Sequence, residues 1–218
     1  MSTYAVSELV KEVKVLLDRN QETSGLLTPT DSDTLSQGEL IQSKIVDAAR
    51  IILMDAPAYM LDGEKFDGLK TAWAESNGAY VGTVYLPSDM IRLLNVKASD
   101  WNRSAEIITE EDDAYKIQCN RFGVRGNPER PIAALIHNSG NRYLELFTSK
   151  SNTATVSLTY VGMPSISNGN IDLPETLKDS IVYMAGYLTC ISLGDTDSAN
   201  GLLGVARKLA HIVEPTTS

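Results

Sequence analysis

The N-terminal part of the chain has the apolar spacing of two helices. Over 6–19, apolar residues recur every three or four positions and charged residues fill the positions between them, which is the pattern of a helix with one buried face. After a long polar loop over 20–35, Ser36 and Glu39 have the spacing of a capping box. We therefore expect a second helix that begins at Ser36 and is stopped by Pro57. The expected buried positions are Val6, Leu9, Val10, Val13, Leu16 and Leu17, then Leu40, Ile41, Ile45, Ala48, Ala49 and Ile52.

From residue 80 the period changes, and apolar residues alternate with polar ones as they do in half-buried strands. The alternation is clearest over 153–161, where Ala154, Val156, Leu158 and Tyr160 are expected to face inward. Residues 55–80 show neither period and are expected to be irregular. A short helix is expected over 110–118, because acidic residues begin it. Strands are predicted at 80–86, 90–97, 132–137, 142–148 and 153–161.

The helical period returns near residue 172. Asp172 is expected to cap a helix whose early Pro174 needs no hydrogen-bond donor, and Gly194 is expected to end that helix. A second helix is expected from about 197 to 212. The buried residues expected in the first of these helices are Leu177, Ile181, Met184, Leu188 and Ile191.

Together these elements predict an α+β fold, with a helical bundle from the N- and C-terminal helices and a central antiparallel β-layer. Neither pair of helices can bury its apolar stripe alone, so we expect the two pairs to pack together. One domain is expected over 1–218, a length that supports a core without disulfides or a structural metal. Its parts are N-terminal helices over 1–57, a β-rich layer over 80–161 and a C-terminal helical hairpin over 172–213.

The charge and the hydropathy of the chain argue against some classes of partner. The formal net charge is −9, and residues 21–80 hold ten acidic side chains against four basic ones. The sequence lacks the dominant basic stripe of a general nucleic-acid binder, whereas acidic regions repel DNA and so let it pass without sticking. The chain has no apolar run of eighteen residues and no signal-peptide pattern at its start. We therefore expect no membrane association and production in a cytoplasm.

No motif of a known catalytic or metal site is present in the sequence. His137 and His211 are isolated, and Cys119 and Cys190 lie far apart in unrelated contexts. We therefore expect no zinc site, no disulfide framework, no cofactor and no enzymatic activity.

Two acidic stretches are candidates for carboxylate or calcium sites, and both are interpreted as structural. Consecutive acids over 110–113 cannot converge on one substrate from a helix start, so a solvated first turn is favoured. The stretch 195–201 faintly resembles a calcium loop, but its glycine comes one place late and Ala206 stands where the bidentate Glu is needed. An interhelical turn capped by Asp195 is the better interpretation.

Several large or basic side chains are candidates for contacts with partners. Tyr59, Phe66 and Trp73 occur in the stretch expected to be irregular, where a lone monomer would expose large apolar groups. Trp73 and Trp101 could each anchor the core or an interface, and the sequence favours neither role. A basic cluster also occurs, for which ion pairing with acidic segments of the same or a neighbouring copy is favoured over phosphate contact. Its members are Arg121, Arg125 and Arg130.

Three segments in order carry a resemblance to a known family. They are Tyr85-Leu-Pro-Ser-Asp-Met-Ile-Arg-Leu-Leu-Asn-Val96, the segment from Arg121 to Pro131, and Ile171-Asp-Leu-Pro-Glu-Thr-Leu-Lys-Asp-Ser-Ile-Val182. With the two-helix start and the final helix, the chain resembles the head-to-tail connector proteins of short-tailed phages. These are also called tail adaptor or tail tubular protein A, and the versions of crAss-like phages are the most similar.

The resemblance implies a structural virion protein with a role in genome ejection. Such proteins form a ring, typically a dodecamer, that binds below the portal protein in the neck, extends the DNA channel and docks other tail or ring proteins. DNA would pass through without sequence-specific binding, and assembly would occur in the cytoplasm of the bacterial host. Contacts with the portal and neighbouring subunits are expected from 20–35, 55–80 and the tail after 212. The alternatives are another virion ring or tail-assembly component, and a small nucleic-acid-binding module.

Overall fold

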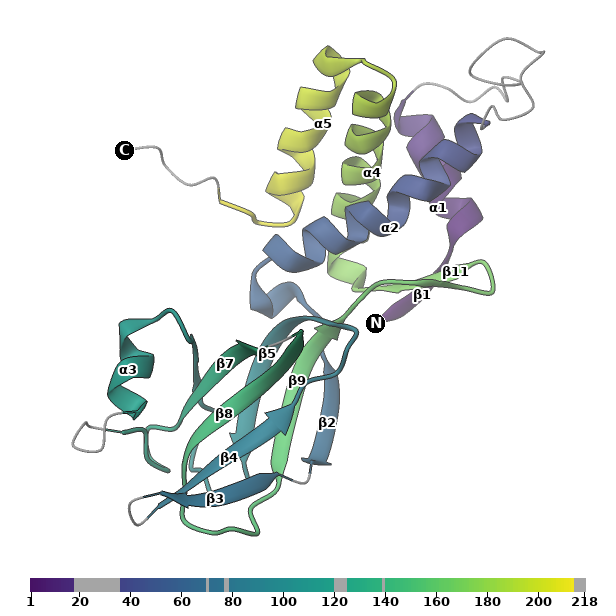
Figure 1. The fold of residues 1–218 in the computed structure, drawn as a ribbon. Helices are drawn as coiled ribbons and strands as arrows, with labels where there is room; N and C mark the ends of the chain where they lie inside the picture. Colours follow the sequence, from purple (N-terminus) through teal and green to yellow (C-terminus); the bar gives the residue numbers. More distant parts are fainter. Residues whose placement is uncertain (18–35, 70, 77–78, 120–124, 139, 214–218) are drawn as a thin grey trace. The chain divides into compact units, whose positions relative to one another are not determined.

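The computed structural model describes residues 1–17, 36–69, 71–76, 79–119, 125–138 and 140–213. The fold is mixed α+β, as expected, with helices from both ends of the chain and sheets in the middle (Figure 1). The chain forms two compact units. The helical unit consists of residues 1–62 and 163–218, and the β unit consists of residues 63–162.

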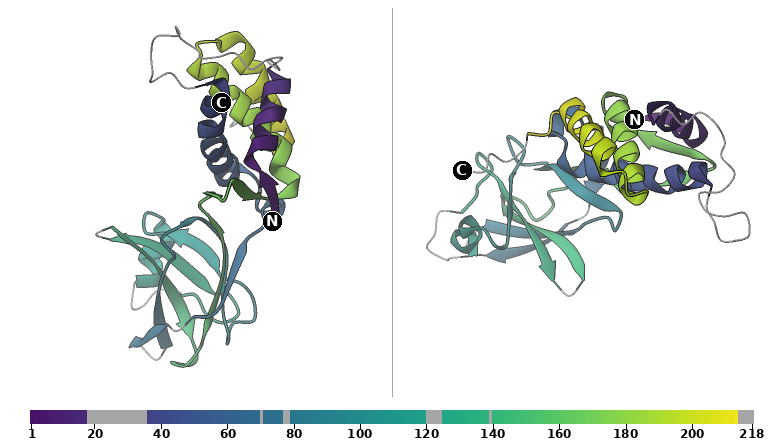
Figure 2. Two further views of the ribbon diagram at one scale, coloured as in Figure 1. Left: turned by 90° about the vertical axis from the view of Figure 1, so that its right-hand side faces the viewer. Right: turned by 90° about the horizontal axis from the view of Figure 1, so that it is seen from above.

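The helical unit confirms that the N- and C-terminal helices form one bundle. The central helix α4 (Lys178–Ser192) packs against α1 (Val6–Leu16), α2 (Gln37–Asp55) and α5 (Thr196–Leu209) (Figure 1 and Figure 2). Short 3₁₀ helices, η1 (Ala58–Met60) and η2 (Glu175–Leu177), follow α2 and precede α4. The largest fully buried side chains of this bundle are Leu9, Ile41, Ile45, Ile52, Leu53, Leu177 and Ile181. Most of them belong to the apolar stripes that the spacing indicated.

The start of α2 is fixed by the expected capping box. The Ser36 hydroxyl accepts a hydrogen bond from the backbone N–H of Glu39, and the Ser36 backbone N–H donates to the Glu39 carboxylate at 2.7 Å. These two bonds satisfy backbone and side-chain groups that a bare helix end would leave to water. The helix ends at Asp55, and Pro57 follows it closely.

Replacing Ser36 by Ala is expected to lower the free energy of unfolding by about 1 kcal/mol, because the N-terminal cap is lost. The matched control is Ser43→Ala in the same helix. Ser43 donates to the carbonyl of Leu40 inside the helix, a bond whose loss should hardly change stability. Urea unfolding of both variants measures the difference, and equal midpoints would contradict the role given to Ser36.

The cap also predicts a pH effect at Glu39. Hydrogen bonds from the Ser36 backbone N–H and hydroxyl hold the pKa of Glu39 below its usual value. A lowered folded-state pKa stabilises the fold above the pKa that Glu has in the unfolded chain, and this stabilisation is lost as pH falls through the folded-state pKa. Ser36→Ala should therefore raise the pKa of Glu39 in an NMR titration. A pKa of Glu39 that does not change in the variant would contradict this explanation.

The turn between α4 and α5 is the expected Asp-capped connection. Gly194 has φ of +78°, the left-handed conformation that commonly ends a helix and that glycine adopts without strain. Asp195 then caps α5 by accepting the backbone N–H of Ser198 at 3.2 Å. The side chain of Asp195 therefore serves the helix start, as the interpretation of 195–201 predicted.

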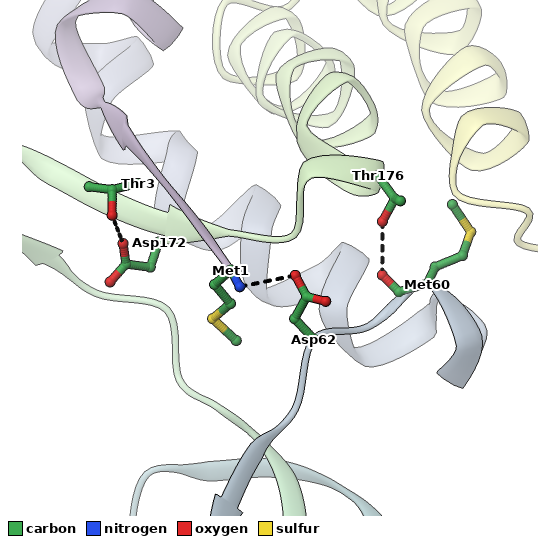
Figure 3. A network of polar contacts seen from close by, with 6 residues as sticks. All are labelled: Met1, Thr3, Met60, Asp62, Asp172 and Thr176. Carbon is green, nitrogen blue, oxygen red and sulfur yellow. Dashed lines mark hydrogen bonds and ion pairs between the residues drawn. The ribbon is translucent and has the colours of Figure 1, made fainter.

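The expectation that Asp172 caps a helix is wrong. Asp172 lies in strand β11 (Asn170–Leu173), between β1 (Ser2–Ala5) and β10 (Ile166–Ser167) in a small sheet. Its carboxylate accepts the hydroxyl of Thr3 at 2.6 Å (Figure 3). Residues before a proline favour extended backbone, and pairing with β1 uses that preference; the helix begins only after Pro174.

Two further contacts hold η1 and Asp62 within the helical unit. The N-terminal ammonium of Met1 lies 3.2 Å from the Asp62 carboxylate, and Thr176 donates its hydroxyl to the Met60 carbonyl at 2.9 Å (Figure 3). These contacts hold the chain on both sides of Leu61, whose side chain is buried.

The described residues of the β unit form two sheets rather than the single expected layer. One sheet has the order β2-β9-β5 and the other β3-β4-β8-β7-β6. The strands are β2 (Glu64–Leu69), β3 (Ala72–Ser76), β4 (Ala79–Tyr85), β5 (Met90–Ala98), β6 (Glu106–Thr109), β7 (Ile132–Asn138), β8 (Asn141–Ser149) and β9 (Val156–Gly162). All the described pairs are antiparallel except β6 with β7, which is parallel.

The core of the β unit lies between the two sheets. Val84 and Leu144 come from one sheet, and Val96 and Leu158 from the other. The expected alternation of β9 is confirmed, because Ala154, Val156, Leu158 and Tyr160 are all buried. The short helix α3 (Asp113–Cys119) packs Ala114 and Tyr115 onto the outer face of the larger sheet.

The expectation that 55–80 is irregular is wrong for most of that stretch. Strands β2 and β3 lie within it, each at the edge of a sheet. Edge strands are often short and charged, and β2 reads Glu64-Lys65-Phe66-Asp67 without an apolar alternation. Their pairing with β9 and β4 is a tertiary effect that the local pattern did not indicate.

Candidate interaction surfaces

A first apolar groove lies between α2 and α4. It has a volume of about 560 Å³, and Met54 and Ile191 on it are 47% and 45% exposed. The lining residues are Lys44, Asp47, Arg50, Ile51, Met54, Leu188, Ile191 and Ser192. We call this surface the α2/α4 groove. It combines an apolar floor with two basic side chains and one acidic side chain.

A second groove lies between α1 and α4 and has a volume of about 370 Å³. Val15 on it is 64% exposed. The lining residues are Lys11, Glu12, Val15, Leu16, Asp179, Val182 and Tyr183. We call this surface the α1/α4 groove. It has the opposite charge balance, with two acidic side chains and one basic side chain.

An ion pair fixes the two helices that border the α1/α4 groove. The Lys178 ammonium donates to the Glu12 carboxylate at 2.6 Å and so joins α4 to α1. This hydrogen bond raises the pKa of Lys178 above its usual value, although partial burial opposes the rise. Because Glu12 is neutralised in this way, Asp179 contributes the main uncompensated negative charge of the groove.

The two grooves use opposite faces of α4. Val182 lines one groove and Ile191 the other. They are nine residues apart, which corresponds to about two and a half helical turns, so their side chains leave the helix on opposite sides. The helical unit therefore has two different partly apolar surfaces.

Tyr59 is exposed, as its proposed role as an interface residue requires. It lies in η1 with 75% of its surface accessible. Its hydroxyl lies 2.7 Å from Nδ1 of His211, which follows α5 and is also exposed. This contact links η1 to the end of the C-terminal hairpin. A role of Tyr59 in partner binding stays a prediction.

Phe66 is half-exposed on the edge strand β2. Its ring centroid lies 6.0 Å from that of Tyr160, and 44% of its surface is accessible. The Tyr160 hydroxyl donates to Glu64 at 3.3 Å. Burial, followed by the negative charges of Asp89 and Glu64, raises the pKa of Tyr160. Phe66 is accessible to a partner at the sheet edge, and its role there stays a prediction.

The structure favours the core alternative for both tryptophans. Trp101 is 2% exposed and donates its indole N–H to the carbonyl of Thr148 at 2.9 Å. Trp73 packs against the same core and donates to the carbonyl of Ala154 at 2.8 Å. A Cβ at Gly82 would lie 2.6 Å from the Trp73 ring, so the glycine makes room for this side chain. Trp101 offers no accessible surface to a partner in this fold.

The members of the basic cluster have different environments. Arg121 lies outside the described residues. Arg125 is half-buried and donates to the hydroxyl of Ser76 at 3.2 Å, which ties its loop to the end of β3. Arg130 is exposed. Within the described chain neither Arg125 nor Arg130 forms an ion pair, so pairing with a neighbouring copy stays a prediction.

The acidic stretch over 110–113 organises a turn. Asp112 accepts the backbone N–H of Thr109 at 2.7 Å and also its hydroxyl, which lowers the pKa of Asp112. Asp113 pairs with Lys116 one turn later. Among the described residues, His, Cys, Asp and Glu side chains do not gather in groups of three or more that could hold a metal ion.

Sequence reasoning missed the exposed apolar residues of the two grooves. Val15 lies beside the expected stripe of the first helix, and an apolar residue off the stripe was the signal that could have found it. Met54 was also outside the expected stripe. Ile191 was expected to be buried, which is wrong, because no described residue covers that side of α4 near its end.

Comparisons with known proteins do not assign a family. No protein-family model matches the chain, and no curated protein is significantly similar to it. The segments that carry the resemblance are placed as follows: Tyr85–Val96 spans the end of β4, a turn and most of β5, and Ile171–Val182 spans β11, η2 and the start of α4. The segment 121–131 is described only from residue 125. In the described part of the chain, no helix is both long and apolar enough to cross a membrane.

Proposed function

We propose that this chain is a structural subunit of the head-to-tail connector ring of a short-tailed phage. In this proposal the ring lies below the portal, extends the DNA channel and docks the tail. The observation that carries it is the presence of two different partly apolar grooves on opposite faces of α4. Within the described residues Val15 and Ile191 stay exposed, and a partner that covers the grooves would bury them.

Two different faces are what a ring subunit requires. In a closed ring each subunit contacts the next through unlike surfaces, whereas a twofold dimer uses one surface twice. The order of the three segments that resemble connector proteins supports the phage assignment. The same grooves would serve another virion ring or tail-assembly component, and the location of the chain in the particle distinguishes that alternative.

The proposal also includes a lumen that DNA crosses without being held. The net charge of −9 supports this part, because acidic surfaces repel phosphates. The assembled protein should therefore show no salt-dependent retention of duplex DNA in a filter-binding assay. Tight binding at low salt that falls steeply with added salt would favour the alternative of a nucleic-acid-binding module.

The proposal is tested by quantitative mass spectrometry of purified phage particles. We expect the chain to be present in the same copy number as the portal protein, because a connector ring matches the symmetry of the ring that it docks onto or continues. A copy number comparable to that of the major capsid protein, or absence from the particle, would contradict the proposal.

A further inference from the structure

We infer that the two grooves are each other's partner: the α1/α4 groove of one copy binds the α2/α4 groove of the next. This inference rests on the proposed function and names the surfaces that would join neighbouring subunits. A second copy of this chain would occupy both grooves.

The exposed apolar side chains give the first argument. Val15 is 64% exposed on one groove, and Met54 and Ile191 are 47% and 45% exposed on the other. Each set lines an open, mostly apolar depression. Docking the two grooves buries both sets at once, which supplies the hydrophobic part of the association.

The charges give the second argument, and they select unlike pairing. The α2/α4 groove carries Lys44 and Arg50 with one acid, Asp47, and the α1/α4 groove carries Glu12 and Asp179 with one base, Lys11. Among the described side chains, Lys44, Asp47 and Arg50 of one groove and Lys11 and Asp179 of the other form no ion pair, whereas Glu12 is paired with Lys178. The unpaired side chains therefore leave an excess of positive charge on the α2/α4 groove and none on the α1/α4 groove. Joining unlike grooves offers Asp179 to Lys44 and Arg50 and keeps two positive grooves apart.

Pairing two α2/α4 grooves would bring charges of the same sign together. Two α2/α4 grooves would face each other with Lys44 and Arg50 on both sides, and juxtaposed like charges weaken an interface. Because the two grooves lie on opposite faces of α4, unlike pairing leaves one groove of each kind free at the ends of every open chain of copies. Association therefore continues until a ring closes or a filament forms.

The test uses two variants that each damage one groove. Val15→Lys adds a charge to the α1/α4 groove near the end of α1, where a base suits the helix dipole. Ile191→Lys adds a charge of the same sign to the α2/α4 groove, so that the two damaged grooves repel each other in a mixture. Both residues are exposed, so both variants should fold, which circular dichroism checks. The matched control is Val205→Lys, at a residue of α5 that is 39% exposed and lines neither groove.

The expected results differ for single and mixed samples. Light scattering and native mass spectrometry should show oligomers for the wild type and the control. Each groove variant alone should associate at least about tenfold more weakly than the wild type. A mixture of Val15→Lys with Ile191→Lys should give a one-to-one dimer, because each variant still has the one groove that the other needs and the two damaged grooves repel each other.

A charge exchange gives a second readout. Lys44→Glu and Asp179→Lys should each weaken association, and the double variant should recover part of it, since the opposite charges are restored with exchanged sides.

The outcomes that overturn the inference are distinct from those that overturn the proposed function. A wild type that stays monomeric at its highest soluble concentration overturns the inference. Oligomers that all variants leave unchanged also overturn it, because the copies then join through other surfaces. Either result leaves the proposed connector role standing if the chain is found at the neck of the particle. If the mixture forms the dimer but the chain is absent from the neck, the pairing of the grooves stands and the connector role is overturned.

Discussion

Replacing Ile181 by Asp is expected to unfold the helical unit. Ile181 is 1% exposed on α4, the helix that packs against the other three helices of the bundle. An unpaired charge at such a site costs several kcal/mol, which is a large part of the roughly 5–15 kcal/mol that stabilises an ordinary domain. The measurement is thermal unfolding followed by circular dichroism in the far ultraviolet. The variant should have lost much of its helical signal at room temperature.

The chain offers a matched control for this change. Ile191→Asp makes the same substitution in the same helix, but at a side chain that is 45% exposed. It should keep the helical signal, with a melting temperature close to that of the wild type. Equal loss of helix in both variants would contradict the assignment of Ile181 to the core and of Ile191 to the surface.

Replacing Trp101 by Ala is expected to destabilise the β unit by about 3–5 kcal/mol, the range for removing a large buried aromatic side chain. The side chain is 2% exposed between the two sheets, and the change also removes the hydrogen bond to the carbonyl of Thr148. Urea unfolding, followed by the fluorescence of the remaining Trp73, measures the loss.

Tyr85→Ala is the control for the tryptophan. Tyr85 also lies in the β unit, but 72% of its surface is accessible, and its removal should change stability by less than about 1 kcal/mol. If Trp101→Ala unfolds no more readily than the control but fails to assemble, then Trp101 is an interface anchor and its assignment to the core is wrong.

The elements that the sequence predicted well are those that local interactions determine. The start of α2 followed from Ser36 and Glu39, which bond to each other across three residues. The inward residues of β9 followed from strict alternation, because one face of the strand is buried. The end of α4 followed from Gly194, whose left-handed backbone is a local requirement.

The failures have a common physical cause, which is pairing between distant residues. Asp172 was expected at a helix start because β1, more than 160 residues earlier, is not visible in the local pattern. Strands β2 and β3 were missed because edge strands lack a buried face with regular alternation.

The candidate site was predictable only in part. The exposure of Tyr59 and Phe66 agrees with their proposed role, whereas the burial of Trp101 follows from packing between two sheets that the sequence did not separate. The two grooves could not be predicted, because each one requires a pair of helices from opposite ends of the chain to lie side by side.

Cryo-electron microscopy of the neck of the purified phage would show whether the chain forms the connector ring. We expect a closed ring of this chain between portal and tail, into which the helical unit and the β unit fit as separate bodies, with the α1/α4 groove of each copy against the α2/α4 groove of its neighbour. Density at that position that belongs to a different chain, with this chain found elsewhere or missing from the particle, would contradict it.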